Sequence, residues 1–168
     1  CGIASRRKSE KIILDGRITI NNQIITDLSC TVKDKDVVEI DGNRIRTPQI
    51  QEYYILHKPK GYICSNSDEL GRKNITDLIN TKKRIYPVGR LDKDTTGLIL
   101  LTDDGDFTNR ILHPKYKITR KYYAYTKETL ALKDINKIKK GIFLRKGERA
   151  QADIKHVDFV KGKHKWRV

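Results

Sequence analysis

The stretch YPVGRLDKDTTGLILLTDDGD, from Tyr86 to Asp106, decides how the chain is expected to fold. Two apolar runs, YPVG and GLILL, lie on either side of the polar segment RLDKDTT. Apolar runs bounded by turn residues are typical of β-strands. The stretch therefore predicts two strands joined by a loop. That loop carries Asp92 on a rigid scaffold, where functional residues are often found.

Outward from this stretch, short strands and helices follow one another without regular βαβ units. Strand-like patterns occur in YYILH, KYYAYT, RAQADIKHVDFV and KHKWRV, and helical patterns in NITDLINT, DFTNRILHP and ALKDINKIKKGIFL. Asn74 or Thr76 is expected to cap the first helix, Pro114 to end the second and Gly141 to stop the third. This order predicts an α+β fold with a largely antiparallel mixed sheet flanked by helices.

The beginning of the chain predicts a smaller helix-plus-hairpin module. Ser5 is a candidate N-cap for a helix that Gly16 would end. The run RITINNQIIT alternates around Asn21-Asn22, which indicates a hairpin. We expect this module over residues 1–46, a linker over residues 47–51 and a second domain over residues 52–168. The chain has no methionine, and KHKWRV stops inside a strand-like run, so we expect a fragment that lacks both ends.

The charge of the chain favours a polyanionic partner. It contains 36 Lys and Arg against 21 Asp and Glu, a formal charge of +15. Residues 115–168 alone hold 17 basic and 5 acidic residues, which gives +12. A lysine-rich solvated surface would also show an excess, but one this unevenly placed favours nucleic acid, whose phosphates it can neutralise.

Other features of the composition narrow the class of protein. Cys1, Cys30 and Cys64 are widely spaced and form no CxxC pair, so reduced thiols are expected rather than disulfides or a zinc site. No apolar run approaches the roughly 20 residues of a membrane span. We expect a cytoplasmic protein with no membrane partner and no metal.

Three interpretations compete for the acidic loop after Gly89. A calcium loop would use Asp92, Asp94 and Asp103, but its flanks look like strands, whereas that motif needs helices. Turn and cap roles suit the aspartates of TDDGD, because short carboxylates accept bonds from nearby backbone N–H groups. A catalytic carboxylate suits Asp92, which Arg90 could hold ionised by a charge-assisted hydrogen bond. Residue chemistry leaves catalysis and the turn role at even odds for Asp92.

A longer comparison favours catalysis. The segment GRLDKDTTGLILLTDDGD resembles the signature of the bacterial ribosomal RNA pseudouridine synthases of the RsuA type. ILHKPKGYICS and ILHPKYKITRKYYAYT are similar to neighbouring segments of that family, in the same order. CGIASRRKSEKIILDGRITINN resembles the RNA-binding motif first described in small-subunit ribosomal protein four. The resemblance covers nearly the whole chain.

The resemblance implies site-specific isomerisation of uridine to pseudouridine in ribosomal RNA, without a cofactor. Asp92 would be the essential carboxylate, acting on a flipped-out uridine, and it would either attack the ribose carbon or abstract a proton from it. Arg90 would pair with Asp92. Tyr123 would stack on the base or assist proton transfer, with Tyr122 as the alternative if the register differs by one.

The resemblance also implies how the RNA is held. Lys121 and the basic residues of the N-terminal module would contact phosphates: Arg6, Arg7, Lys8 and Lys11. The family pattern suggests a monomer. The rival hypothesis is a non-catalytic RNA-binding or ribosome-associated protein, which explains the basic residues but not the carboxylate loop.

Overall fold

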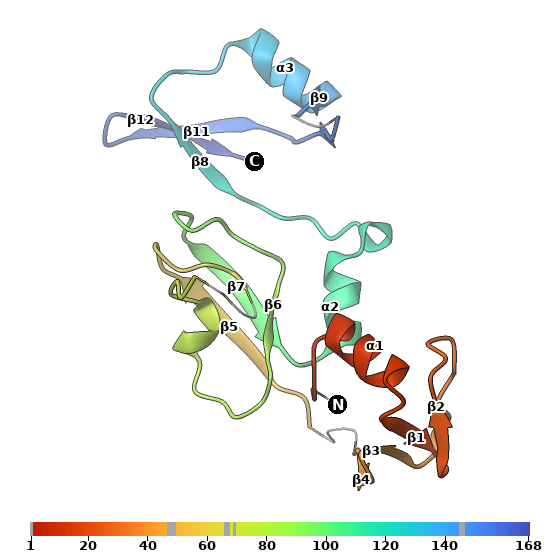
Figure 1. Cartoon of the computed structure of the whole chain (residues 1–168). Helices are drawn as coiled ribbons and strands as arrows, with labels where there is room; N and C mark the ends of the chain where they lie inside the picture. Colours follow the sequence, from red (N-terminus) through yellow and green to blue (C-terminus); the bar gives the residue numbers. More distant parts are fainter. Residues whose placement is uncertain (1, 47–49, 66–67, 69, 145–146) are drawn as a thin grey trace. The chain divides into compact units, whose positions relative to one another are not determined.

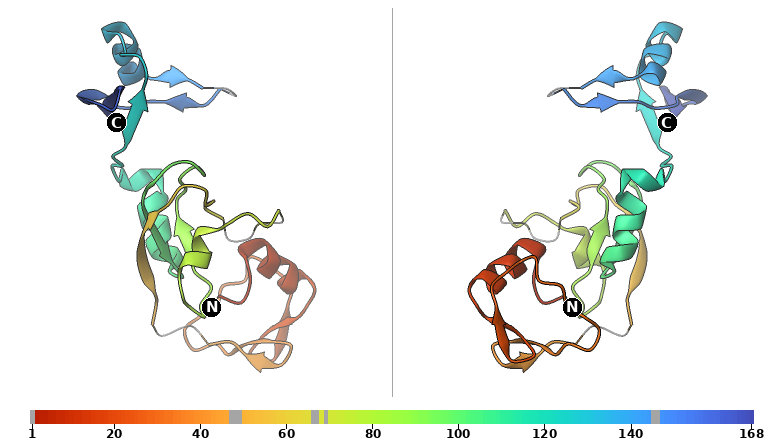
Figure 2. Two further views of the ribbon diagram at one scale, coloured as in Figure 1. Left: turned by 90° about the vertical axis from the view of Figure 1, so that its left-hand side faces the viewer. Right: turned by 90° about the vertical axis from the view of Figure 1, so that its right-hand side faces the viewer.

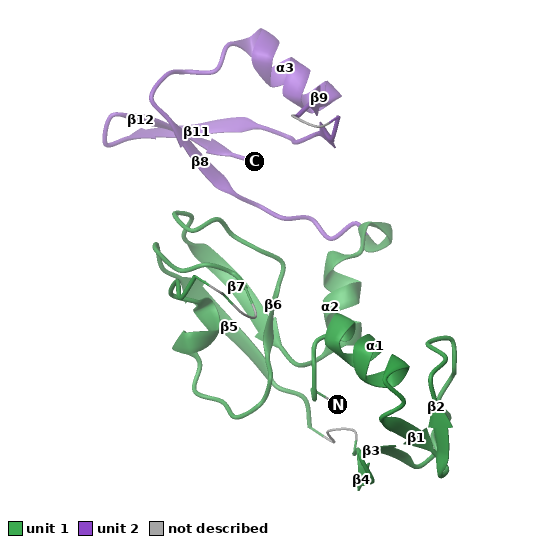
Figure 3. Ribbon diagram, in the orientation of Figure 1, with its two compact units in different colours: residues 1–116 green, residues 117–168 purple. Residues whose placement is uncertain are grey.

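The computed structural model describes residues 2–46, 50–65, 68, 70–144 and 147–168 (Figure 1). It divides into two compact units, residues 1–116 and 117–168, which are described separately below (Figure 3). Residues 47–49 of the predicted linker, and Cys1, lie outside the described residues. No helix in the described part of the chain is both long enough and apolar enough to cross a membrane.

The first unit begins with one helix and a small antiparallel sheet whose strand order is β2-β1-β3-β4. Its elements are α1 (Arg6–Leu14), β1 (Ile18–Ile20), β2 (Gln23–Ile25), β3 (Val38–Ile40) and β4 (Asn43–Arg44). Figure 2 shows α1 beside this sheet. The predicted helix and hairpin are therefore confirmed.

Local chemistry explains the bounds of this helix and hairpin. The Ser5 side chain accepts a hydrogen bond from the Lys8 N–H, 3.3 Å away, and so caps α1. Gly16 follows the helix at a φ of +69°, the left-handed conformation that commonly ends helices. Asn21 and Asn22 both have positive φ, 52° and 68°, which is the requirement of the tight turn between β1 and β2.

The rest of the first unit is built on a second antiparallel sheet, in the order β5-β7-β6. Its elements are β5 (Tyr53–Lys58), the 3₁₀ helix η1 (Ile75–Leu78), β6 (Tyr86–Val88), β7 (Gly97–Thr102), α2 (Gly105–Leu112) and the 3₁₀ helix η2 (Pro114–Tyr116). The central strand β7 is the apolar run GLILLT, and it pairs with a neighbour on each edge. The two strands predicted around the Asp92 loop are thus adjacent in this sheet.

A compact apolar cluster holds this sheet. It consists of Ile75, Ile85, Ile99 and Leu101, all buried, with partly buried side chains packed around them. Leu101 is fully buried, whereas Leu98 on the same strand is 74% exposed. Burial of an apolar side chain stabilises the fold roughly in proportion to the area removed from water, so β7 is anchored mainly through its inward residues.

The second unit contains a three-stranded antiparallel sheet in the order β11-β12-β8, a short β9-β10 hairpin and one helix. Its elements are β8 (Tyr123–Thr126), α3 (Leu132–Lys140), β9 (Ile142–Phe143), β10 (Arg149–Ala150), β11 (Lys155–Val160) and β12 (Lys163–Arg167). Trp166 is only 2% exposed, and its indole N–H donates to the Thr126 hydroxyl at 2.8 Å. Trp166 is therefore a core residue of this unit.

The α+β class and the antiparallel pairing predicted from the sequence are confirmed, with two differences in detail. NITDLINT forms a four-residue 3₁₀ helix, capped by Asn74, whose N–H donates to Asp77 Oδ2 at 3.0 Å, and the chain returns to extended backbone at Ile79. The run RAQADIKHVDFV is divided between β10 and β11, with Ile154 buried between them. The two parts pair with different strands, β10 with β9 and β11 with β12.

Leu101→Ala should lower the free energy of unfolding by about 2–5 kcal/mol, because it removes fully buried methyl groups and leaves a cavity. Leu98→Ala, on the same strand, is the matched control and should change it by no more than about 0.5 kcal/mol. Denaturant titration measures both variants. Equal effects of the two substitutions would contradict the assignment of the core.

Candidate active-site loop

The candidate site is the loop between β6 and β7, and Gly89 starts it. Gly89 has a φ of +89°, which side chains other than glycine rarely adopt. A Cβ atom there would also lie 3.4 Å from Leu112 Cδ2 of α2. The residue thus lets the backbone leave β6 sharply, close against α2, and sets the path of the residues that follow.

Leu91 fixes the next part of the loop to the core. Its side chain packs against the apolar cluster under the sheet. Its backbone is held by Cys64: the Leu91 N–H donates to Cys64 Sγ, and the thiol donates to the Leu91 carbonyl, each over 3.3 Å. Arg90 and Asp92, on either side of this anchored leucine, are both exposed.

Lys58 holds the other side of Asp92. Its side chain is fully buried at the end of β5, and its ammonium donates to the carbonyls of Lys93 at 3.0 Å and Thr95 at 2.9 Å, and to that of Pro59 at 3.1 Å. A lysine ammonium has three N–H donors, so all three are used. The Lys93 carbonyl also accepts a hydrogen bond from the Gly61 N–H, at 2.9 Å.

The loop therefore presents Asp92 from a fixed backbone. The Thr95 N–H donates to the Asp92 carbonyl at 3.0 Å, which closes a tight turn and leaves the exposed carboxylate outside it. Among the residues that the structure describes, no ion pair within 4.0 Å joins Arg90 to Asp92. That pair stays a prediction. A carboxylate held in this way can serve as a nucleophile or as a base.

Asp103 and Asp104, after β7, have structural roles, as the turn interpretation predicts for them. Asp104 caps α2 by accepting from the Phe107 N–H at 2.9 Å, and it accepts from the Tyr53 hydroxyl at 2.6 Å. These bonds, that from Phe107 above all, hold the pKa of Asp104 below its ordinary value. Asp103 accepts from the Glu52 N–H at 2.8 Å.

The calcium-loop interpretation is not supported. The residues after the loop form strand β7 rather than a helix, and six extended residues span about 20 Å, so Asp103 cannot close a site with Asp92. Within the described part of the chain, no cluster of three or more His, Cys, Asp or Glu side chains can hold a metal ion.

The remaining predicted site residues lie on two other elements. In the second unit, Tyr123 is 58% exposed on β8, with the Lys165 ammonium 4.3 Å from its ring centroid, and Lys121 is exposed just before this strand. Tyr122 precedes Tyr123, so their side chains point to opposite faces of the sheet. Because Asp92 belongs to the first unit, its approach to Tyr123 stays a prediction.

In the first unit, helix α1 exposes the four basic residues predicted to bind phosphates: Arg6, Arg7, Lys8 and Lys11. Arg6 Nε lies 3.4 Å from Glu10 Oε1, an exposed pair four residues apart. Such a pair is weak and leaves the guanidinium available to a phosphate.

Comparison with known proteins places this geometry in a family. The model of the RNA pseudouridylate synthase family matches residues 52–168, and the S4 domain model matches residues 2–38. The chain belongs to the RNA pseudouridylate synthase family.

Relatives of the chain agree with this assignment. Ribosomal large subunit pseudouridine synthase B of Bacillus subtilis is 40% identical over 163 residues, which are 96% of this chain and 66% of that protein. An uncharacterized RNA pseudouridine synthase of Aquifex aeolicus is 43% identical over 149 residues, 87% of this chain and 59% of the relative. The chain thus spans somewhat less than two thirds of the length of these relatives.

A solved structure extends the similarity to the fold. The crystal structure of a pseudouridylate synthase matches 98% of this chain and 71% of its own length, with a TM-score of 0.61 and 26% sequence identity. The resemblance read from GRLDKDTTG and its neighbouring segments is therefore confirmed at the level of the pseudouridylate synthase family.

Two residues that support the loop in this member of the family were missed by sequence reasoning. The sequence analysis gives Lys58 no role of its own and predicts for Cys64 only a reduced thiol. A signal for Lys58 exists in YYILHK, because the alternation of the strand places it on the same, inner face as Tyr54 and Leu56. Nothing in the sequence points to the contact of Cys64 with Leu91.

Lys58→Met should weaken the loop, because carbonyls that the ammonium now satisfies lose their donor at a cost of about 1–3 kcal/mol for each buried group left unpaired. The free energy of unfolding should fall, and backbone amides of residues 91–96 should exchange hydrogen faster. Lys60→Met, two residues along and exposed, is the control and should change neither quantity. Unchanged hydrogen exchange in the Lys58→Met variant would contradict a role of Lys58 in positioning the loop.

The cap of α2 should make stability depend on pH. Because the pKa of Asp104 is depressed in the folded state, its contribution is fully present above the ordinary carboxyl value near pH 4 and is lost as pH falls through the folded value. The difference in Tm between the unmodified chain and Asp104→Asn should therefore be largest at neutral pH and shrink in acid. Asp106→Asn, at an exposed residue of the same helical turn, should show a smaller difference at neutral pH.

Proposed function

We propose that the protein isomerises uridine to pseudouridine at specific positions of ribosomal RNA, with Asp92 as the essential catalytic carboxylate. One observation carries the proposal: in a chain of this family, an exposed Asp92 stands on a loop whose backbone is fixed on both sides, by Cys64 through Leu91 and by Lys58. Enzymes hold reacting groups within a narrow geometry, and a buried clamp under an exposed carboxylate meets that need.

The proposed reaction balances without an oxidant or a hydrolytic water. The bond between ribose C1′ and uracil N1 breaks, the base turns, and a bond from C1′ to C5 forms. The C5 proton is then lost and N1 gains one. Asp92 either attacks C1′ or abstracts a proton from the ribose, and both routes use its ionised form. Neither route calls for a cofactor or a metal ion.

A uridine within structured RNA must leave its stack to reach the loop. Flipping a base costs a few kcal/mol, which stacking on an aromatic side chain partly offsets. Tyr123 is the proposed partner for the base or for proton transfer at C5, with Tyr122 as the alternative. Arg90 is proposed to pair with Asp92 and hold the opened nucleotide.

The positive charge of the chain supports ribosomal RNA as the substrate. The S4 domain match over residues 2–38 includes the four exposed basic residues of α1, and the basic second unit includes Lys121. Phosphate contacts of this kind position RNA without reading its sequence. We propose a monomeric cytoplasmic enzyme in which residues 1–46 bind RNA, residues 47–51 link and residues 52–168 belong to the catalytic domain.

The rival function is RNA binding without catalysis, and an assay on the full-length protein with unmodified ribosomal RNA separates the two. Asp92→Asn should lower the rate of pseudouridine formation by about 10²–10⁴-fold or more, while RNA affinity stays within a few-fold. Asp94→Asn, exposed in the same loop, is the matched control and should retain activity. Wild-type protein that binds RNA and forms no pseudouridine would establish the rival function.

A further inference from the structure

The sheet of the second unit has two chemically different faces. In an antiparallel sheet, directly paired residues point to the same side, and alternate residues along a strand share a side. Lys165 pairs with Tyr125, and Arg167 pairs with both Tyr123 and Lys155. We call this side the tyrosine face, which carries Tyr123, Tyr125, Lys155, Asp158, Val160, Lys163, Lys165 and Arg167.

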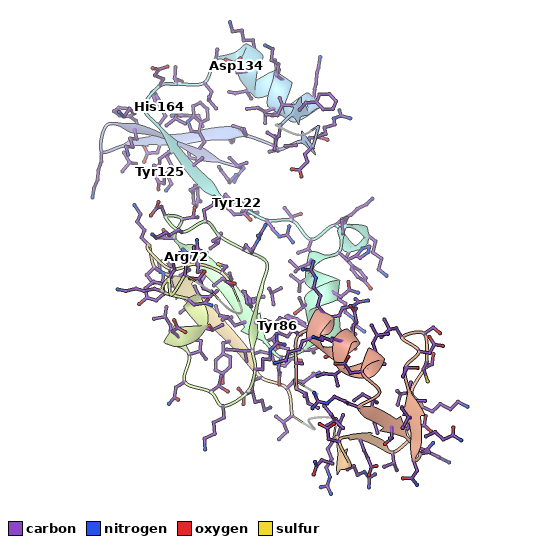
Figure 4. All side chains as sticks on the ribbon, in the orientation of Figure 1. Arg72, Tyr86, Tyr122, Tyr125, Asp134 and His164 are labelled. Atoms are coloured by element: carbon purple, nitrogen blue, oxygen red, sulfur yellow. The ribbon has the colours of Figure 1, made fainter. Side chains whose placement is uncertain are left out.

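The opposite side is occupied by contacts among its own residues. Trp166 is buried there, with the His156 ring centroid 4.9 Å from that of the indole. His156 Nε2 lies 3.2 Å from His164 Nδ1, and Phe159 packs edge-on against His164. Figure 4 shows Tyr125 and His164 on opposite sides of the sheet. Trp166 is therefore committed to packing, whereas Phe159 on the same side stays 58% exposed.

The tyrosine face differs in carrying exposed tyrosine rings beside cations. Tyr123 and Tyr125 are 58% and 53% exposed, and the Lys165 ammonium lies over the Tyr123 ring. Four cations and one carboxylate, Asp158, lie on this side in the three strands. Exposed aromatic planes beside cations are the combination with which proteins hold single-stranded nucleic acid, since the rings stack on bases and the cations contact phosphates.

The spacing of the tyrosines selects the form of the RNA. Two residues apart on a strand, their side chains are separated by about 6.8 Å along it. Bases within a duplex lie about 3.4 Å apart along each strand and show no free face to a protein. Two neighbouring rings at twice that spacing match an unstacked single strand instead.

We propose that the tyrosine face binds a single-stranded segment of RNA, with a base stacked on Tyr125 and phosphates held by Lys165 and Arg167. The inference rests on the proposed function for its choice of RNA. It goes beyond that function because the residues other than Tyr123 have no part in the reaction: they hold nucleotides that flank the target. The face thus adds a contact for unpaired RNA to those made by α1.

The test uses the full-length protein and a dodecamer RNA without uridine, so that no target nucleotide contributes to binding. Tyr125→Leu should weaken binding about five- to 150-fold, the effect of losing one stacked base, whereas Tyr125→Phe should stay within about twofold. Lys165→Gln should lower the slope of log affinity against log salt by about 0.7. Fluorescence anisotropy measures these changes, and ultraviolet cross-linking with mass spectrometry should locate RNA on β8 or β12.

Matched controls come from the same unit. Phe143→Leu removes a 77% exposed aromatic of β9, and Lys133→Gln removes an exposed charge of α3, and neither should change binding as much. Buried Trp166 fluorescence checks folding of each variant. Affinity equal to these controls in both the Tyr125→Leu and Lys165→Gln proteins would overturn the proposal. So would an equal effect of Tyr125→Leu on binding to a duplex of the same sequence.

Failure of this proposal is distinguishable from failure of the proposed function. If wild-type protein forms pseudouridine and Tyr125→Leu binds the uridine-free strand normally, the proposed RNA contact of the tyrosine face is wrong and the proposed enzymatic function is retained. If no pseudouridine forms but Tyr125→Leu and Lys165→Gln lose affinity as expected, the face binds RNA in a protein that does not catalyse.

Discussion

The buried ammonium of Lys58 is the interaction on which the candidate site depends. A charged group without solvent is stable only when its donors are satisfied, and here three backbone carbonyls satisfy them. The dependence is mutual, because carbonyls of a loop at the end of a sheet also need donors. The result is a loop whose backbone is fixed by buried hydrogen bonds and whose exposed side chains are polar. A short surface turn of lysines, aspartates and threonines would otherwise have few reasons to keep one conformation.

Much of this fold follows from rules that act over a few residues. Ser5, the pair Asn21-Asn22 and Gly141 stand where capping and turn geometry predict them, since each requirement is met by the residue itself and its immediate neighbours. Strand β7 is also predictable from the sequence, because an unbroken apolar run favours a place inside a sheet. Asp104 also fits, as a carboxylate one residue before a helix.

The contacts that hold the candidate site could not be predicted from such local rules, because they join segments far apart in sequence. Lys58 contacts residues 35 and 37 positions later, and Cys64 contacts Leu91 27 positions later. Lys58 directly precedes a proline, with a glycine three positions later, so it resembles a turn residue until the alternation of the strand is followed to its last position. The family signature located Asp92, but it carried no information on what holds that residue in place.

The positive charge of the chain is divided unequally between the two units. Residues 117–168 hold 16 basic and 5 acidic residues, a net +11, whereas residues 1–116 hold 20 and 16, a net +4. Under the proposed function, Asp92 acts close to a polyanion that repels it, so cations that attract the RNA are needed. Under the proposed function, the cations of the second unit attract the phosphates of the RNA over long range. Asp92 can then depend on backbone contacts for its position, since the groups that fix its loop are carbonyls, one buried ammonium and a thiol rather than surface ions that salt would screen.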